Sequence, residues 1–186
     1  MKNLLKFSEL QLLIIVGWIA FFSLNEALTS LLPYKDYIAL IFLPAGFQIV
    51  LACLLRWQCF LGLFIGSIIT GLIYLNESNN HHLWIFSFFS AFIPIIVVLV
   101  IDYLCNLGFE LSEINLQKII LVAVLYALLS SAMHNIYLLL LGEISLYQYQ
   151  QDSLAMFIGD ITGALIFLTV LSYYRIPLII IANKYF

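Results

Sequence analysis

Charge is the property that this sequence has least of. Only 9% of its 186 residues are Asp, Glu, Lys or Arg, against about 25% in an ordinary globular chain. Apolar residues make up 65% of the chain and the mean hydropathy is +1.11. A soluble fold of this length could not bury so much apolar surface. The composition therefore excludes a water-soluble globular protein and predicts a single integral membrane domain over residues 1–186.

The sequence also lacks any cluster of basic residues. Seven Lys and Arg face ten Asp and Glu, and the net charge is -3. A protein that binds nucleic acid needs clustered Lys and Arg to neutralise phosphates. We therefore expect no nucleic-acid partner, and expect the lipid bilayer to surround most of the chain.

Residues that bind metals or cofactors are few. The three cysteines lie in or beside apolar runs without metal-ligand spacing, as small buried hydrophobic residues do: Cys53, Cys59 and Cys105. His81 and His82 could bind a metal together with Glu77, but adjacent histidines in a loop are more often solvated. The sequence predicts neither a metal site nor a cofactor.

Patterns typical of catalysis inside a membrane are missing as well. Ser130 and Ser131 share one helix with His134, whereas a serine nucleophile needs a base on a neighbouring element. Asp160 has no aspartate at matching depth, because Asp102 falls near the opposite membrane face. We therefore expect that the protein is not an enzyme.

What the sequence does have is six apolar runs separated by short polar breaks. A membrane-spanning helix needs about 20 apolar residues, and the runs do not alternate as strands of a barrel would. They predict an all-α, six-helix transmembrane bundle whose second helix is broken at Pro44. The expected helices cover about 10–32, 37–55, 59–75, 83–105, 117–141 and 153–174, and 175–186 forms an interfacial cytoplasmic tail.

The basic residues predict the orientation of this bundle. With six helices, one side carries six of the seven Lys and Arg residues and the other side carries Lys35. The six are Lys2, Lys6, Arg56, Lys118, Arg175 and Lys184. Because cytoplasmic loops are enriched in Lys and Arg, both termini are expected in the cytoplasm of a bacterial cell, with the bundle in its inner membrane.

The stretch FIGDITGA places the carboxylate of Asp160 in an apolar run between Gly159 and Gly163. An ionisable group inside a membrane is costly and marks a functional site by default. The expected helix puts Asp160 about 12 Å below the outer surface. It is the strongest single candidate for a ligand-binding residue.

Other polar groups on the expected helices reach a similar depth. The predicted set, which would bind a small ligand from the periplasmic side, is Asp160, His134, Asn135, Gln48, Glu26, Pro44 and Gly46. Structural alternatives exist: His134 can be a satisfied interior histidine, Asn135 a bond between helices, and Glu26 a hydrated boundary residue. Pro44 would free a backbone carbonyl and help to open the pocket.

Two pairs of glycines have the spacing of helix-packing motifs. They are Gly62 with Gly66, and Gly159 with Gly163. Small residues at this spacing allow two helices to approach closely. The second pair would hold Asp160 against a neighbouring element.

Two stretches together resemble a known family, the first type of membrane-associated sensor domain (MASE) of bacterial signalling proteins. They run from Leu43 to Gly71 and from Phe157 to Tyr174. The residues that carry the resemblance are Pro44, Ala45 and Gly46 in the second helix, Gly62, Gly66 and Ser67 in the third, and Gly159, Asp160 and Gly163 in the last.

The resemblance implies a sensor in signal transduction. Family members usually have more helices and feed a cytoplasmic histidine kinase, diguanylate cyclase or phosphodiesterase. A shortened, stand-alone member would instead signal through a partner protein in the cytoplasm or the membrane. The alternatives are a transport protein, either the substrate-binding subunit of an energy-coupling-factor transporter or a small solute transporter, and a purely structural subunit.

Overall fold

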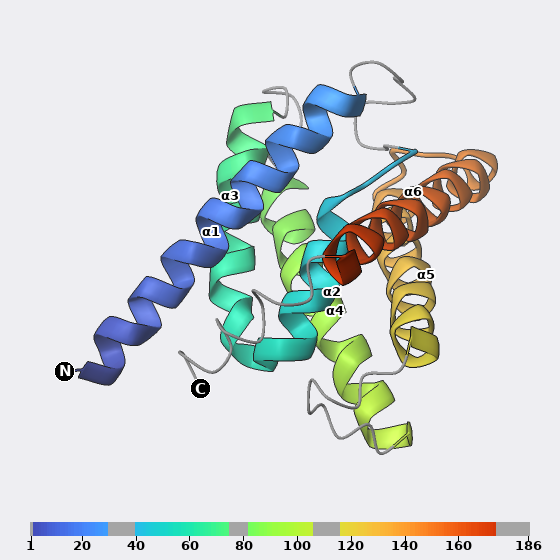
Figure 1. Cartoon of the computed structure of the whole chain (residues 1–186). Coiled ribbons are helices and arrows are strands. Elements are labelled where there is room, and N and C mark those ends of the chain that lie inside the picture. The colour runs from blue at the N-terminus through green and yellow to red at the C-terminus, as the bar shows by residue number, and fades with distance from the viewer. Residues whose placement is uncertain (1, 30–39, 75–81, 106–115, 174–186) are drawn as a thin grey trace.

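The computed structural model describes residues 2–29, 40–74, 82–105 and 116–173, and these ranges contain helices and no β-strand. The helices are α1 (Lys2–Thr29), α2 (Pro44–Leu55), the 3-10 helix η1 (Arg56–Cys59), α3 (Phe60–Tyr74), α4 (Leu83–Cys105), α5 (Leu116–Leu140) and α6 (Leu146–Tyr173). Figure 1 shows them as one bundle.

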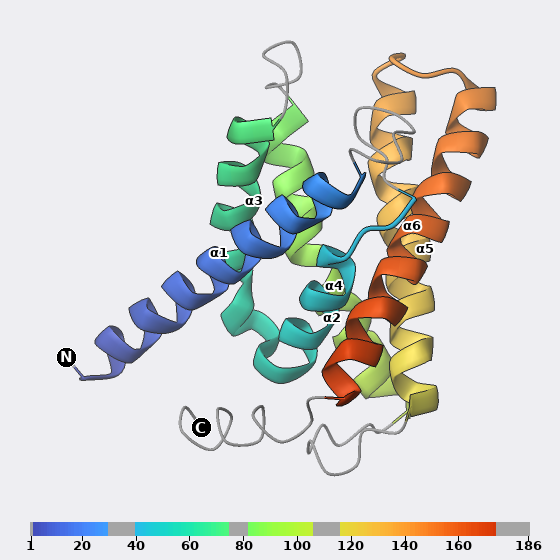
Figure 2. The same ribbon diagram turned by 45° about the horizontal axis from the view of Figure 1, so that its top comes forward.

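The helices alternate in direction through this bundle. Helices α1, α3 and α5 run one way, and α2, α4 and α6 run the other way (Figure 2). Helix α3 packs between α1 and α4, and α5 pairs with α6. The short helix α2 lies in the middle, where it contacts α1, α4, α5 and α6. Any change in the position of α2 is therefore felt by four neighbours.

The outer surfaces of the helices suit a lipid environment. Five stretches are long and apolar enough to span a membrane, and α2 and α3 share one of them. Large apolar side chains stand exposed on several helices, among them Leu12, Leu72, Leu128 and Val170. Such an exposed apolar surface is stable in a bilayer and not in water. The prediction of an all-helical membrane protein is confirmed, while the six-helix count and the side of each terminus stay predictions.

The predicted second helix is wrong in its first half. The apolar run from 37 was expected to be helical, but residues 40–43 are not helical and α2 begins at Pro44. Residues 37–39 lie outside the described ranges. Pro44 therefore starts a helix instead of breaking one, because its missing N–H is not needed in the first turn. With 12 residues, α2 is about 18 Å long and too short to cross a membrane alone.

The first and last helices begin earlier than the apolar runs indicate. Helix α1 begins at Lys2 instead of 10, and α6 begins at Leu146 instead of 153. The start of α6 is fixed by Ser145 and Gln148, because each side chain accepts a hydrogen bond from the backbone N–H of the other. This reciprocal pair is a capping box, which a search for apolar runs cannot detect. The expected tail at 175–186 lies outside the described residues.

Helix α1 is held against α3 by small residues and one buried hydrogen bond. A Cβ on Gly62 would meet Ile14 at 2.7 Å, and one on Gly66 would meet Trp18 at 2.9 Å. The indole N–H of Trp18 donates to the Thr70 hydroxyl at 3.0 Å. The first glycine pair thus lies where two helices approach closely.

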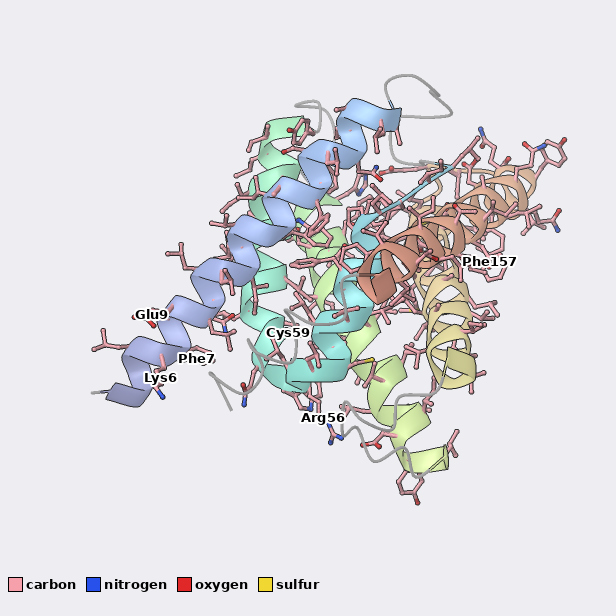
Figure 3. All side chains as sticks on the ribbon, in the orientation of Figure 1. Lys6, Phe7, Glu9, Arg56, Cys59 and Phe157 are labelled. Atoms are coloured by element: carbon pink, nitrogen blue, oxygen red, sulfur yellow. The ribbon has the colours of Figure 1, made fainter. Side chains whose placement is uncertain are left out.

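A tight turn joins α2 to α3 at one end of the bundle. Arg56 has a positive φ of 50° there, and its guanidinium lies 2.7 Å from the Asp102 carboxylate on α4. Gln11 of α1 donates to the backbone carbonyl of Gln58. Lys6 and Arg56 lie toward the same end of the molecule (Figure 3). Asp102, expected to be a boundary residue, is ion-paired at this end.

Candidate functional site at the start of α2

The non-helical residues 40–43 run against the middle of α6. The backbone N–H of Phe42 donates to the Gly159 carbonyl at 3.0 Å, and the Thr162 hydroxyl donates to the Leu40 carbonyl at 2.9 Å. A Cβ on Gly163 would stand 2.0 Å from the Phe42 oxygen. Irregular backbone at membrane depth must find its hydrogen bonds inside the protein. The second glycine pair therefore accommodates this segment directly on α6.

Helix α1 supports the same segment from the other side. The backbone N–H of Leu43 donates to Oδ1 of Asn25 at 2.8 Å. Asn25 is buried, and its Nδ2 has no hydrogen-bond partner among the described residues. Glu26, the residue predicted from the sequence, is the neighbour of Asn25 and is only partly buried. The amide, and not the carboxylate, is the group of α1 that reaches the start of α2.

Gln48 links α2 to two further helices. It is fully buried, one turn after Pro44. Its Nε2 donates to the Ser90 carbonyl of α4 at 2.9 Å, and its Oε1 accepts a hydrogen bond from the Tyr126 hydroxyl of α5. Both ends of the amide are thus used, which fixes its orientation.

Asp160 extends this network to α6. Its side chain is 1% exposed. Ser130 and Tyr126 of α5 are electrostatic neighbours of this carboxyl. Oxygen Oδ2 of Asp160 has no hydrogen-bond partner within the described part of the chain. We call the side chains of Gln48, Tyr126, Ser130 and Asp160 the buried polar chain.

The Lys and Arg side chains that the structure describes lie away from Asp160. Lys6 and Arg56 lie toward one end of the bundle, away from Phe157 in the turn before Asp160 (Figure 3). A carboxylate buried without a cation or a full set of donors is strongly unfavourable. The Asp160 carboxyl is neutral when protonated, and when ionised it is suited to a positive or hydrogen-bonding partner.

The other predicted residues point elsewhere. Nδ1 of His134 lies 2.8 Å from the Ser130 carbonyl, and the ring packs against Phe86 and Phe89 of α4 with centroid distances of 5.1 and 5.3 Å. Asn135 donates to the Ser131 carbonyl and approaches Met156 of α6. The structure thus relates Gln48 to Asp160 through Tyr126, and turns His134 toward an aromatic contact.

Pro44 and Gly46 define where α2 starts and how closely it packs. Both residues are buried. A Cβ on Gly46 would stand 2.4 Å from Cβ of Phe167. They position Gln48, which follows one turn later, and contribute close packing rather than hydrogen-bonding side chains to the site.

Three residues of the site were missed or given another meaning by sequence reasoning. Tyr126 and Asn25 were not predicted, and Ser130 was considered only as a nucleophile. The only sign of these residues in the sequence was a polar side chain within an apolar run. Which helix face it occupies depends on the neighbours, and this could not be read from the sequence.

A second buried polar group lies at the start of α4. His82 was expected to be solvated, but its side chain is 2% exposed, and this expectation is wrong. Its Nε2 lies 2.8 Å from Oε2 of Glu143, and its ring stacks on Phe86. His81 and Glu77 lie outside the described residues. Among those described, no group of three or more His, Cys, Asp or Glu could hold a metal.

Comparison with known proteins identifies a family. The MASE1 family model matches residues 9–178, which is nearly the whole chain. Neither a curated protein nor a solved structure matches. The resemblance carried by the Pro44 and Asp160 motifs is confirmed. The chain belongs to the MASE1 family of membrane-associated sensor domains.

Proposed function

We propose that the chain is a sensor of the bacterial inner membrane that binds a small ligand from the periplasmic side at the buried polar chain. The observation that carries this proposal is the unpartnered Oδ2 of Asp160 on a side chain that is 1% exposed. An ionisable group at this depth in a membrane bundle is a binding-site candidate. We propose binding alone, with no catalytic step.

The start of α2 supports this proposal because it can move without unfolding a helix. Residues 40–43 are held to α6 and α1 by individual hydrogen bonds, from Phe42 to Gly159 and from Leu43 to Asn25. A ligand that bonds Asp160 changes the α6 side of this contact. Such a ligand shifts the equilibrium between two positions of α2 by its difference in affinity for them.

The conformational change would be passed to an output protein at the far end of α2. Arg56 follows the helix and pairs with Asp102 of α4. We propose that this end faces the cytoplasm, in keeping with the Lys and Arg count. A shift of α2 would then alter the α2–η1 turn and reach an output protein in the cytoplasm or the membrane.

The test compares two aspartates of α6 in the full chain, purified and reconstituted in lipid nanodiscs. The probe is the small-molecule fraction of periplasm, and the readout is the change in unfolding temperature followed by tryptophan fluorescence. We expect the fraction to shift wild type and Asp152→Asn, because Asp152 lies about 12 Å away along the helix. Asp160→Asn should not respond. A response of Asp160→Asn equal to wild type would sink the proposal.

Transport is the second candidate, because discontinuous helices also form substrate sites in transporters. The half-length of α2 and its start against the middle of α6 favour it. The sensor proposal predicts binding of the periplasmic fraction without accumulation of its solutes in proteoliposomes. Accumulation that needs Asp160 would identify a transporter instead.

A further inference from the structure

We infer that the ligand of the buried polar chain is a monovalent metal cation such as Na⁺. This inference deepens the proposed function and rests on its ligand site. It names the class of ligand, which neither the family nor the comparisons specify.

The available atoms at the site are oxygens. The buried polar chain offers a carboxylate oxygen from Asp160, hydroxyl oxygens from Ser130 and Tyr126, and the amide oxygen of Gln48. The imidazole of His134 is turned toward Phe86 and Phe89. Oxygen ligands suit the hard alkali and alkaline-earth ions, whereas zinc and copper prefer nitrogen or sulfur.

The single carboxylate of the site favours a monovalent cation over a divalent one. Asp160 with one monovalent cation is neutral, whereas a divalent ion would leave a buried net charge that is costly in a low dielectric. Glu26 of α1 is partly buried beside Asn25, and three other described carboxylates are engaged or distant. Asp102 pairs with Arg56, Glu143 pairs with His82, and Asp152 lies two turns away on α6.

The unwound segment adds carbonyl oxygens at the same level. The Phe42 carbonyl lies against Gly163, which is three residues after Asp160. It accepts a bond from the Ala45 N–H, and a carbonyl oxygen has a second lone pair. Unwound backbone of this kind coordinates cations in other membrane proteins. The Phe42 carbonyl is therefore a further acceptor against α6, less than one turn along the helix from Asp160.

Close packing favours an ion over an organic molecule. A single added carbon at Gly163 would overlap the backbone of Phe42, and one at Gly46 would overlap Phe167. Gln48 and Asp160 are buried by their own neighbours. An organic cation would have to displace these elements, whereas a bare ion need only replace missing hydrogen bonds.

The experiment measures unfolding temperature of the full chain in nanodiscs with NaCl, KCl, MgCl₂ or N-methyl-D-glucamine chloride at equal ionic strength. We expect a saturable rise with Na⁺ or K⁺ relative to the organic cation, by about 5 °C or more at a hundredfold excess over Kd. Asp160→Asn should abolish the shift, and Ser130→Ala should weaken the affinity about tenfold. Asp152→Asn should keep it. If Asp160→Asn does not fold, Ser130→Ala and Tyr126→Phe provide the comparison.

Three results would overturn the inference. They are equal unfolding temperatures in all four salts, a shift with Mg²⁺ as large as with Na⁺ or K⁺, and a cation shift that survives Asp160→Asn. If the periplasmic fraction still stabilises the wild type through Asp160 while salts have no effect, the proposed sensor stands and the metal cation is wrong. If neither probe depends on Asp160, both fail.

Discussion

The carbonyl of Phe42 lies against Gly163 so closely that a Cβ on the glycine would stand 2.0 Å from the oxygen and 2.7 Å from the Leu43 nitrogen. Both contacts are to backbone, which cannot rotate away as a side chain can. Gly163 lies less than one turn from Asp160. The irregular start of α2 and the carboxylate of α6 are therefore parts of one packed unit.

Replacing Gly163 with a larger residue should push the start of α2 away from α6. We expect Gly163→Ala to destabilise the protein by about 3 kcal/mol or more, above the usual cost of overpacking. Gly62→Ala should cost less, because its Cβ would meet side-chain atoms of Ile14 and Gln11 at 2.7–2.9 Å and no backbone atom. Thermal unfolding of both variants in detergent checks the order. Equal losses would contradict the backbone contact at Gly163.

Asn25 and Glu26 form a matched pair on α1. We expect Asn25→Ala to destabilise the fold by about 1–3 kcal/mol, because the buried N–H of Leu43 loses its acceptor. Glu26→Ala should change stability by less than about 0.5 kcal/mol, as partly exposed positions usually do. Chemical unfolding in mixed micelles measures both. A larger effect at Glu26 would restore the residue that the sequence favoured.

His82 and Glu143 should couple the start of α4 to the turn between α5 and α6. A double-mutant cycle with His82→Ala and Glu143→Gln should give a coupling of about 1 kcal/mol. The value is modest because the Glu143 side chain is 39% exposed. Unfolding of the two single variants and the double variant supplies the cycle. Additive losses would show that the pair contributes no interaction energy.

Sidedness can be tested with two exposed aromatic positions at opposite ends of the bundle. Trp57→Cys in η1 and Tyr147→Cys at the start of α6 are made in a background without Cys53, Cys59 and Cys105. A membrane-impermeant maleimide added to spheroplasts should label the Tyr147→Cys variant, and added to inverted vesicles it should label the Trp57→Cys variant. The opposite pattern would place the Arg56 end in the periplasm.

The sequence predicted the membrane class and the burial of two polar residues because these depend on composition and on depth along a helix. Gln48 and Asp160 are costly groups in apolar runs, and the structure buries both. Depth along a helix does not show which neighbouring helix a side chain faces, however. His134 lies one turn from Ser130 but faces α4, since its ring packs against Phe86 and Phe89.

The unwound segment could not be predicted for a related reason. Residues 40–43 are Leu, Ile, Phe and Leu, and an apolar run reads as a helix at membrane depth. What keeps these residues irregular is a set of distant partners, namely Asn25, Gly159 and Thr162. Their contacts are tertiary, so local sequence patterns do not contain them.

Helix α2 is bounded by non-α-helical backbone at both ends, with residues 40–43 before it and η1 after it. Its 12 residues therefore form a separate α-helical segment about 18 Å long. In the proposed sensor, a displacement at Pro44 would reach Arg56 with little loss, because a helix resists compression along its axis. The extent of such a movement would be limited by the close contact between the Phe42 carbonyl and Gly163.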